Sequence, residues 1–218
     1  VLKSQMAIAE YNDADELLNL TGLQIPGVLD DLYTYDGPLG ITYDDDGAPT
    51  ITVWAPTARN VEFLLYADAG AGTESTRLEM TQDAEAGTWS ITGEPDWYGQ
   101  FYRFVVDVFV PLQGEFVTNE VTDPYSVSLS VNSLRSQIID LNDPELMPDG
   151  WLEIEKPELA APEDISVYEL HVRDFSSFDS DVPEELIGTY AAFTLEDTAG
   201  VRHLQALSDA GLTHLHLL

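Results

Sequence analysis

The sequence predicts a mainly β chain, in which an immunoglobulin-like β-sandwich is followed by one β-α-β unit. Between residues 40 and 139, short apolar runs alternate with Gly, Pro, Asn and Asp turns and show no helical spacing. This pattern is typical of an all-β sandwich of about 100 residues. After residue 163 a buried-type strand (165–172), a helix (195–210) and a strand (212–218) follow one another. That order is typical of a parallel sheet covered by helices.

The first residues predict a β-hairpin. Met6 and Ile8 alternate on one face, a polar turn occupies residues 12–15, and an apolar run starts at Leu17. Because the alternation starts so close to Val1, we expect the chain to begin inside a strand, with a segment before it.

Two segments rich in Pro, Gly or acidic residues are expected to separate the regular regions. Pro26 and Gly27 are expected to break regular structure, and residues 30–40 are predicted to form a linker. Residues 140–163 contain four prolines, which preclude a long helix or a central strand, so we expect an ordered connector there.

The sandwich strands are assigned from apolar alternation and from β-branched and aromatic content. They are predicted at residues 41–43, 50–54, 61–66, 89–91, 101–110, 115–117 and 136–139. The large apolar side chains among them are expected to form the core: Trp54, Phe63, Leu65, Trp89, Tyr102 and Phe104.

The charge of the chain excludes several classes of partner. Asp and Glu number 40 against 8 Lys and Arg, which gives a formal net charge of −32. Nucleic acids and anionic membrane surfaces are disfavoured because few cations are present to displace counterions. The acidic residues are spread along the chain, which indicates either a solubilising surface or adaptation to high salt, where self-repulsion is screened.

The composition also limits location and chemistry. The chain has no cysteine, which excludes disulfides, thiolate nucleophiles and Cys-based zinc sites. No window approaches 18 consecutive apolar residues, so we expect no membrane span, and residues 1–6 lack the apolar core of a signal peptide.

Six segments in order carry a resemblance to a known family. They are GVLDDLY (27–33), VWAPTA (53–58), EVTDPYSVSLSVNS (120–133), IIDLNDPELMPDGW (138–151), YELHVRDFS (168–176) and GLTHLHLL (211–218). Together they resemble type I pullulanases, the starch-debranching enzymes of glycoside hydrolase family 13.

The resemblance implies four regions. Residues 1–32 correspond to the tail of a preceding N-terminal domain, and residues 33–140 to a sandwich similar to carbohydrate-binding module family 48. Residues 141–163 form the connector, and residues 164–218 correspond to the truncated start of a catalytic (β/α)8 barrel.

The resemblance also implies a function, namely retaining hydrolysis of α-1,6-glucosidic linkages in pullulan, starch and glycogen-type glucans. Retaining chemistry needs two carboxyl groups about 5 to 5.5 Å apart, held at the ends of barrel strands. The family's catalytic residues lie on later strands, so we expect no catalytic residue in this chain and no activity from it alone. The family implies an extracellular or cell-envelope location.

Carbohydrate contacts are expected at aromatic side chains with neighbouring polar groups. By resemblance to glycan-binding members of the module family, the positions are Phe116 and Asn132. Trp97 and Tyr98, in the polar loop of residues 94–100, form a second candidate platform; the alternative is that they anchor this loop in the core.

Polar residues after the first predicted barrel strand are expected to be structural. His171 and Arg173 alternate near the end of that strand and are expected to bond to barrel residues outside the chain. Asp174 and Asp179 could be interpreted from the sequence as a catalytic acid pair. They do not match the family's catalytic motifs, so we expect both residues to cap a loop or a helix.

No metal site and no cofactor are expected. His214 and His216 have a spacing that can chelate a metal, but no third ligand is evident. The acidic run at residues 44–46 lacks the ligand spacing of an EF-hand, which favours a hairpin turn. The family resemblance is compatible with calcium binding by the full-length enzyme.

The expected partners are an α-glucan polysaccharide and the remainder of the catalytic barrel. Two other functions stay open: a free-standing α-glucan-binding module, and an acidic interaction protein with no link to carbohydrate.

Overall fold

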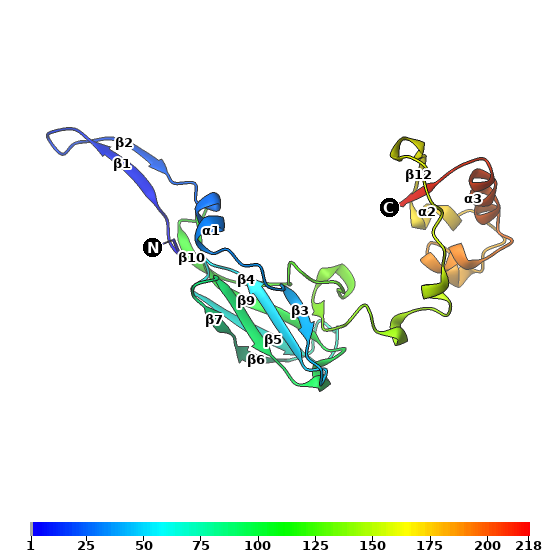
Figure 1. Cartoon of the computed structure of the whole chain (residues 1–218), viewed down its shortest axis with the longest axis horizontal. Helices are drawn as coiled ribbons and strands as arrows, with labels where there is room; N and C mark the ends of the chain where they lie inside the picture. Colours follow the sequence, from blue (N-terminus) through cyan, green and yellow to red (C-terminus); the bar gives the residue numbers. More distant parts are fainter. Residues whose placement is uncertain (1) are drawn as a thin grey trace. The chain divides into compact units, whose positions relative to one another are not determined.

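The computed structural model describes residues 2–218, and the chain divides into two units between Met147 and Pro148. The N-terminal unit holds most of the strands, whereas the C-terminal unit, Pro148–Leu218, holds two strands and two α-helices. Figure 1 shows both ribbons coloured along the sequence.

The N-terminal hairpin is confirmed, but the expectation that the chain begins inside a strand is wrong, because residues 2–6 form turns and irregular structure. Strands β1 (Ala7–Tyr11) and β2 (Leu17–Gly22) pair antiparallel as a separate two-stranded sheet, drawn in blue in Figure 1. All residues of both strands are exposed, including Ile8, Leu18 and Leu20. The hairpin therefore has no buried face of its own.

Helix α1 (Pro26–Leu32) corrects the prediction that Pro26 and Gly27 break regular structure. Proline is tolerated in the first turn of a helix, where its missing N–H has no intrahelical partner in any case. The predicted linker is correspondingly shorter, since the helix occupies its first three residues.

Two antiparallel sheets form the predicted sandwich. One has the order β3-β4-β8-β7, with β3 (Gly40–Tyr43), β4 (Pro49–Trp54), β8 (Thr88–Thr92) and β7 (Thr81–Asp83). The other has the order β10-β9-β5-β6, with β10 (Glu115–Val121), β9 (Phe101–Val110), β5 (Asn60–Tyr66) and β6 (Ser75–Glu79). The short strand β11 (Ser136–Gln137) pairs with the start of β9.

The core lies between these sheets. Its buried members come from strands of both sheets, from the connections after β4 and after β6, and from the segment after β11: Ile51, Val53, Ala58, Val61, Phe63, Met80, Trp89, Tyr102, Phe104 and Ile138. Phe63 stacks on Tyr102 at 5.1 Å between ring centroids, and Tyr102 meets Phe104 edge to face at 5.6 Å. Four of the six predicted core residues are buried; Leu65 and Trp54 are only half-buried.

A buried polar network ties the turn after β10 to the sheet. The hydroxyl of Tyr102 donates to Asp123 Oδ2 at 2.6 Å, and the Asp123 amide donates to Ser136 Oγ at 2.9 Å. Burial raises the pKa of Asp123, although the bonds from Tyr102 and the Tyr125 amide oppose the shift. These bonds satisfy polar groups that are costly to bury unpaired.

Short 3-10 helices punctuate the loops and the predicted connector. In the sandwich they are η1 (Pro95–Trp97) and η2 (Val131–Ser133), and across the connector they are η3 (Pro144–Leu146), η4 (Trp151–Glu153) and η5 (Pro162–Asp164). No long helix or central strand occupies the described connector residues, as its prolines predict.

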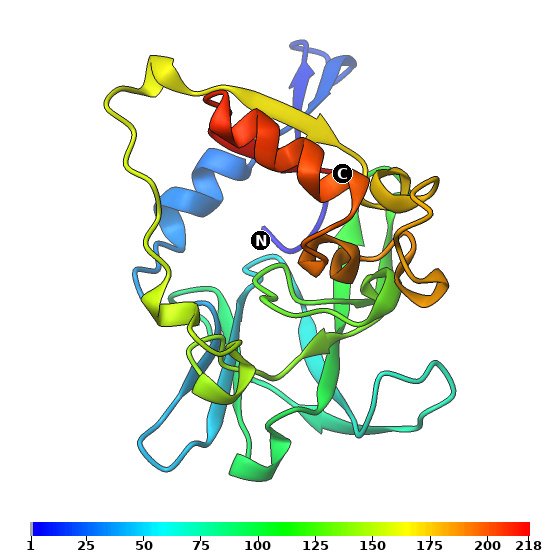
Figure 2. The ribbon, with the colours of Figure 1, turned by 90° about the vertical axis from the view of Figure 1, so that its right-hand side faces the viewer.

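The C-terminal unit contains the predicted β-α-β order. Strands β12 (Val167–Leu170) and β13 (His214–Leu217) pair in parallel, and α3 (Ala199–Asp209) lies between them in sequence. Figure 2 shows α3 beside β12, where the rings of Tyr168 and His203 meet at 5.9 Å. Between β12 and α3 lie α2 (Val172–Ser176), η6 (Glu184–Leu186) and η7 (Tyr190–Thr194).

Burial in this unit is concentrated in the segment between β12 and α3 and not at the sheet. Val172, Val182 and Ala192 are buried, and Phe175 stacks on Phe193 at 4.0 Å. The residues of β13 are all exposed, and those of β12 and α3 are exposed or half-buried. That this unit is the start of a barrel stays a prediction.

Among residues 2–218, no helix combines the length and the apolar character that crossing a bilayer requires.

Candidate functional site

Phe116 lies in β10, half-buried, with one face of its ring already occupied. The Arg59 guanidinium sits 3.2 Å from the ring centroid, and Phe109 meets the ring edge to face at 5.2 Å. An arginine stacked on an aromatic face stabilises both side chains. A sugar therefore reaches that face of Phe116 only by displacing Arg59.

Asn132 is exposed, and its backbone adopts the left-handed helical conformation. Its φ of 57° and ψ of 27° lie in the region where asparagine is tolerated better than most residues, and Ser133 follows at φ 54°. The loop is closed by two bonds, from the Ser130 amide to the Arg135 carbonyl and from the Arg135 amide to Ser130 Oγ, each 2.9 Å. The backbone conformation alone thus explains an asparagine here, while its side chain stays accessible.

A polar groove of ≈ 510 Å³ adjoins the Asn132 loop. Its wall includes Arg135, which is buried; the guanidinium covers the Tyr66 ring at 3.7 Å and donates to the Asp68 carbonyl at 2.7 Å. On the opposite wall Arg103 pairs with Glu120 at 3.0 Å. The one aromatic face in this groove is therefore covered by an arginine.

The strand register separates Phe116 from Asn132. Phe116 pairs with Phe109 near the end of β9, whereas β11, four residues after Asn132, pairs with Tyr102 near its start. Seven residues of strand correspond to about 23 Å. The structure therefore does not bring the two predicted glycan contacts into one site.

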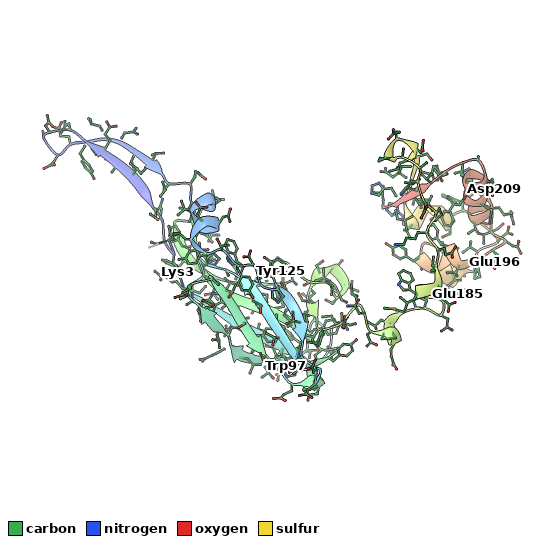
Figure 3. All side chains as sticks on the ribbon, viewed as in Figure 1. Lys3, Trp97, Tyr125, Glu185, Glu196 and Asp209 are labelled. Atoms are coloured by element: carbon green, nitrogen blue, oxygen red, sulfur yellow. The ribbon has the colours of Figure 1, made fainter. Side chains whose placement is uncertain are left out.

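Trp97 packs into the sandwich. Its ring is half-buried and stacks on Phe63 at 5.5 Å, and a Cβ at Gly93 would collide with it. Of the two alternatives for this residue, the structure favours the one in which Trp97 anchors the loop. Figure 3 labels it among the side chains of the sandwich.

Tyr98 is more exposed than Trp97, but its hydroxyl is engaged. It donates to Asp143 Oδ2 at 2.5 Å, and the ring lies 6.2 Å from that of Tyr43. Partial burial and then the bond to Asp143 raise the pKa of Tyr98 to about 12, while the same bond lowers the pKa of Asp143. Tyr98 is 38% exposed, and its acidic neighbour Asp143 accepts its hydrogen bond.

In the C-terminal unit, His171 and Arg173 are not alternating strand residues, which corrects the prediction. Strand β12 ends at Leu170, and His171 caps α2 by accepting the Arg173 amide on Nδ1 at 3.1 Å. Arg173 Nε contacts Asp174 Oδ1 at 2.9 Å, and the bond from Arg173 lowers the pKa of Asp174. All three side chains are exposed; His171 bonds to the backbone of Arg173, and the Arg173 side chain bonds to that of Asp174.

Asp179 caps backbone groups. Its Oδ1 accepts the Asp181 amide and its Oδ2 accepts the Gly200 amide, each at 3.1 Å, and these bonds lower the pKa of Asp179. The residue therefore stabilises the loop before α3 and the first turn of that helix.

The residues considered for metals have other contacts. His216 Nδ1 lies 2.9 Å from Glu169 Oε2, and His214 Nδ1 lies 2.9 Å from Thr213 Oγ1. Within residues 2–218, no three His, Asp or Glu side chains are grouped so that they could hold an ion. Asp44 instead closes the β3–β4 turn, because its Oδ1 accepts the amides of Asp46 and Ala48.

Comparison with known proteins places this fold. Residues 38–126 match the family model of carbohydrate-binding module 48, the isoamylase N-terminal domain, and residues 1–31 match the pullulanase N2 domain. The chloroplastic pullulanase 1 of Arabidopsis thaliana is 43% identical over 100% of this chain and 22% of its own length. The pullulanase of Klebsiella pneumoniae is 40% identical over 98% of this chain and 20% of its own length.

Solved structures agree with the sequence comparisons. The crystal structure of Klebsiella pneumoniae pullulanase complexed with maltotriose superposes with a TM-score of 0.89 at 37% identity, over 100% of this chain and 21% of that one. The chain thus spans about a fifth of the length of these relatives. The resemblance inferred from the six sequence segments is confirmed: this chain is similar along its whole length to the N-terminal region of pullulanases, which are glycoside hydrolases, and it contains a region that matches carbohydrate-binding module 48.

Proposed function

We propose that this chain is the accessory N-terminal part of a glycoside hydrolase that cleaves α-1,6-glucosidic linkages in pullulan, starch and glycogen-type glucans. The observation that carries the proposal is the identity of 40–43% to pullulanases along nearly the entire chain. In this proposal residues 33–140 are the carbohydrate-binding sandwich and residues 164–218 pack against the rest of a (β/α)8 barrel.

The chemistry of the parent enzyme is proposed to be retaining, with its catalytic carboxylates outside this chain. Retaining hydrolysis needs a nucleophile and an acid at a fixed short separation. The acidic residues placed above serve other roles, since Asp174 bonds to Arg173 and Asp179 caps backbone amides. We therefore expect no hydrolysis of pullulan by the 218-residue chain, with calcium added or absent.

The location and the ionic setting are also proposals. Polymeric α-glucan does not cross membranes intact, which supports an extracellular or cell-envelope location, although the Arabidopsis thaliana relative is named as chloroplastic. The net charge of −32 supports a protein that works in high salt.

Glycan binding by the sandwich is proposed at two separate places, the Phe116 end of β10 and the Asn132 loop, with Tyr98 as a further contact. The test is affinity electrophoresis of the chain in gels containing pullulan or amylopectin. We expect retardation that Phe116→Ala or Asn132→Ala reduces. Phe178→Ala, which removes a fully exposed phenylalanine of the C-terminal unit, is the matched control.

The same gels test the alternative of a free-standing α-glucan-binding module, which the buried core of the sandwich favours because it needs no other domain. Strong retardation by residues 33–147 alone, abolished by Phe116→Ala, supports that alternative. Absence of retardation for both lengths of chain contradicts glycan binding and leaves the sandwich a packing role.

A further inference from the structure

An aromatic groove follows the free edge of strand β3. Among residues 2–218, β3 pairs with β4 and with no other strand, so its second edge is not covered by a strand. Two hollows of ≈ 300 and ≈ 330 Å³ share Leu39 and Tyr125 in their walls; the larger one is also lined by β3 itself, and the smaller one by Trp54 of β4. Five aromatic side chains line the two hollows, which together we call the β3 groove: Tyr33, Tyr35, Tyr43, Trp54 and Tyr125.

The rings at the centre of the β3 groove are held in place by other parts of the fold. The Tyr125 amide donates to the buried Asp123 carboxylate at 2.8 Å, and the Tyr125 side chain packs so closely on Gly40 that a Cβ there would lie 3.0 Å away. Trp54 Nε1 donates to the Tyr33 carbonyl at 3.0 Å. Fixed side chains lose little conformational entropy when a ligand binds.

Tyr125 is nevertheless accessible, with 40% of its surface exposed. It stands where the two hollows meet and is labelled in Figure 3. The groove thus combines a preformed shape with an open aromatic surface, and each hollow alone is at the lower end of the volumes of small-molecule sites, about 300–1,000 Å³.

The polar groups of the β3 groove narrow the choice of ligand. The residues lining both hollows include no Lys, Arg or His, and their charged members are the carboxylates Asp30 and Asp140, with the amide of Asn142 nearby. An anion would be repelled by these carboxylates and by the net charge of −32. A neutral ligand with hydroxyl donors meets one carboxylate in each hollow, Asp30 in the first and Asp140 in the second, where Oδ1 of Asp140 already accepts from Asn142.

Glucose units have these properties, because a pyranose ring has a face of C–H groups and a rim of hydroxyls. The C–H face packs on aromatic rings, and the hydroxyls donate to carboxylates and amides. We propose that the β3 groove binds a segment of α-linked glucan, at a surface separate from Phe116 and Asn132. The proposal rests on the proposed function and adds a site to it.

The test is calorimetric titration of the 218-residue chain with maltohexaose, with the β-linked cellohexaose as a second probe. We expect maltohexaose to bind and Tyr125→Ala to weaken it about tenfold, which corresponds to the loss of one aromatic contact. Asn142→Ala and Val127→Glu, both at exposed positions that line the groove, are expected to weaken binding as well. Tyr11→Ala, an exposed tyrosine of the hairpin, should bind like the parent chain.

The results distinguish the possible failures. Binding of maltohexaose that all three groove variants leave unchanged overturns the β3 groove and leaves the proposed function to other surfaces. No binding by the parent chain overturns both. Should Tyr125→Ala fail to fold by circular dichroism, Val127→Glu and Asn142→Ala decide the matter. A parent chain that dimerises, while Val127→Glu stays monomeric and neither binds glucan, assigns the groove to a second copy and contradicts the proposal.

Discussion

The sandwich and the C-terminal unit bury their strands to very different extents. In the sandwich, Ile51, Phe63 and Tyr102 are 0% exposed between two sheets, whereas each residue of β13 is exposed. Parallel strands are ordinarily covered on both faces. The sandwich therefore has a stabilising core of its own, whereas the parallel pair depends on hydrogen bonds between its strands and on a small cluster in the segment between β12 and α3.

The largest expected effect is the removal of a core ring. Phe63→Ala should lower the free energy of unfolding of the sandwich by about 3–5 kcal/mol, because it leaves a cavity between Trp97, Tyr102 and Phe104. Leu217→Ala in β13 should lower the free energy of unfolding of the C-terminal unit by less than about 0.5 kcal/mol, because this side chain is exposed. Urea unfolding followed by tryptophan fluorescence measures both. Equal losses would break the comparison.

The next effect concerns a buried cation of the sandwich. Arg135→Ala should lower the free energy of unfolding by about 2–3 kcal/mol, because the Asp68 carbonyl loses its charged donor and the Tyr66 ring loses the guanidinium that covers it. Arg77→Ala is the matched control, because Arg77 forms an exposed ion pair with Glu62 and should cost about 0.5 kcal/mol or less. The same urea titrations give both values, and a negligible loss for Arg135→Ala contradicts its structural role.

A smaller effect is expected to act on both regions alike. The −32 charge is spread along the chain, so raising salt to molar concentrations should screen repulsion everywhere. We expect the free energy of unfolding to increase by about 1 kcal/mol, which is equivalent to a rise in Tm of about 2–4 °C for a chain of this length. Calorimetric melting in a KCl series measures it. A Tm that does not change with salt contradicts the proposed adaptation.

The smallest effects sharpen the comparison through their sign. Burial raises the pKa of Asp123 in the sandwich, whereas amide bonds lower the pKa of Asp179 in the C-terminal unit. When folding raises the pKa of a carboxyl group, the stability of the fold falls as pH increases from the pKa in the unfolded chain to the pKa in the folded chain. When folding lowers the pKa, the group stabilises the fold above the pKa of the unfolded chain, and this stability is lost as pH falls through the pKa of the folded chain. As pH rises from 2 to 7, the free energy of unfolding of Asp123→Asn should therefore increase relative to that of the parent chain. That of Asp179→Asn should decrease relative to the parent chain.

Hydrogen exchange read separately for the two regions measures these differences. Slopes of the same sign for Asp123→Asn and Asp179→Asn would contradict the assignment of opposite shifts.

Local sequence patterns were enough to predict much of the fold. Strand β9 lies at the predicted residues, because ten consecutive residues rich in Val, Phe and Tyr leave no alternative. Strands β6 and β7 went unpredicted because they are mostly polar and exposed and depend on pairing with β5 and β8. Pro26 was misleading because its effect depends on whether it starts a helix or interrupts one.

The candidate sites depended on information that the sequence does not contain locally. The separation of Phe116 from Asn132 follows from the register of β9 with β10 and β11. The cover of Arg59 over Phe116 joins residues 57 positions apart. The β3 groove is built from residues before β3, from β3 and the end of β4, and from residues after β10, and its aromatic enrichment becomes visible only when those segments are folded together.

The bare hairpin of β1 and β2 has a practical consequence for handling the protein. A two-stranded ribbon with Ile8, Leu18 and Leu20 exposed and both outer edges unpaired within the described residues is a template for strand addition between molecules. Charge repulsion between the acidic molecules opposes such polymerisation. The molar salt that is expected to stabilise the fold therefore also screens this repulsion and favours fibre formation. Concentrated stocks should therefore keep longest in dilute buffer, even if single molecules melt sooner there.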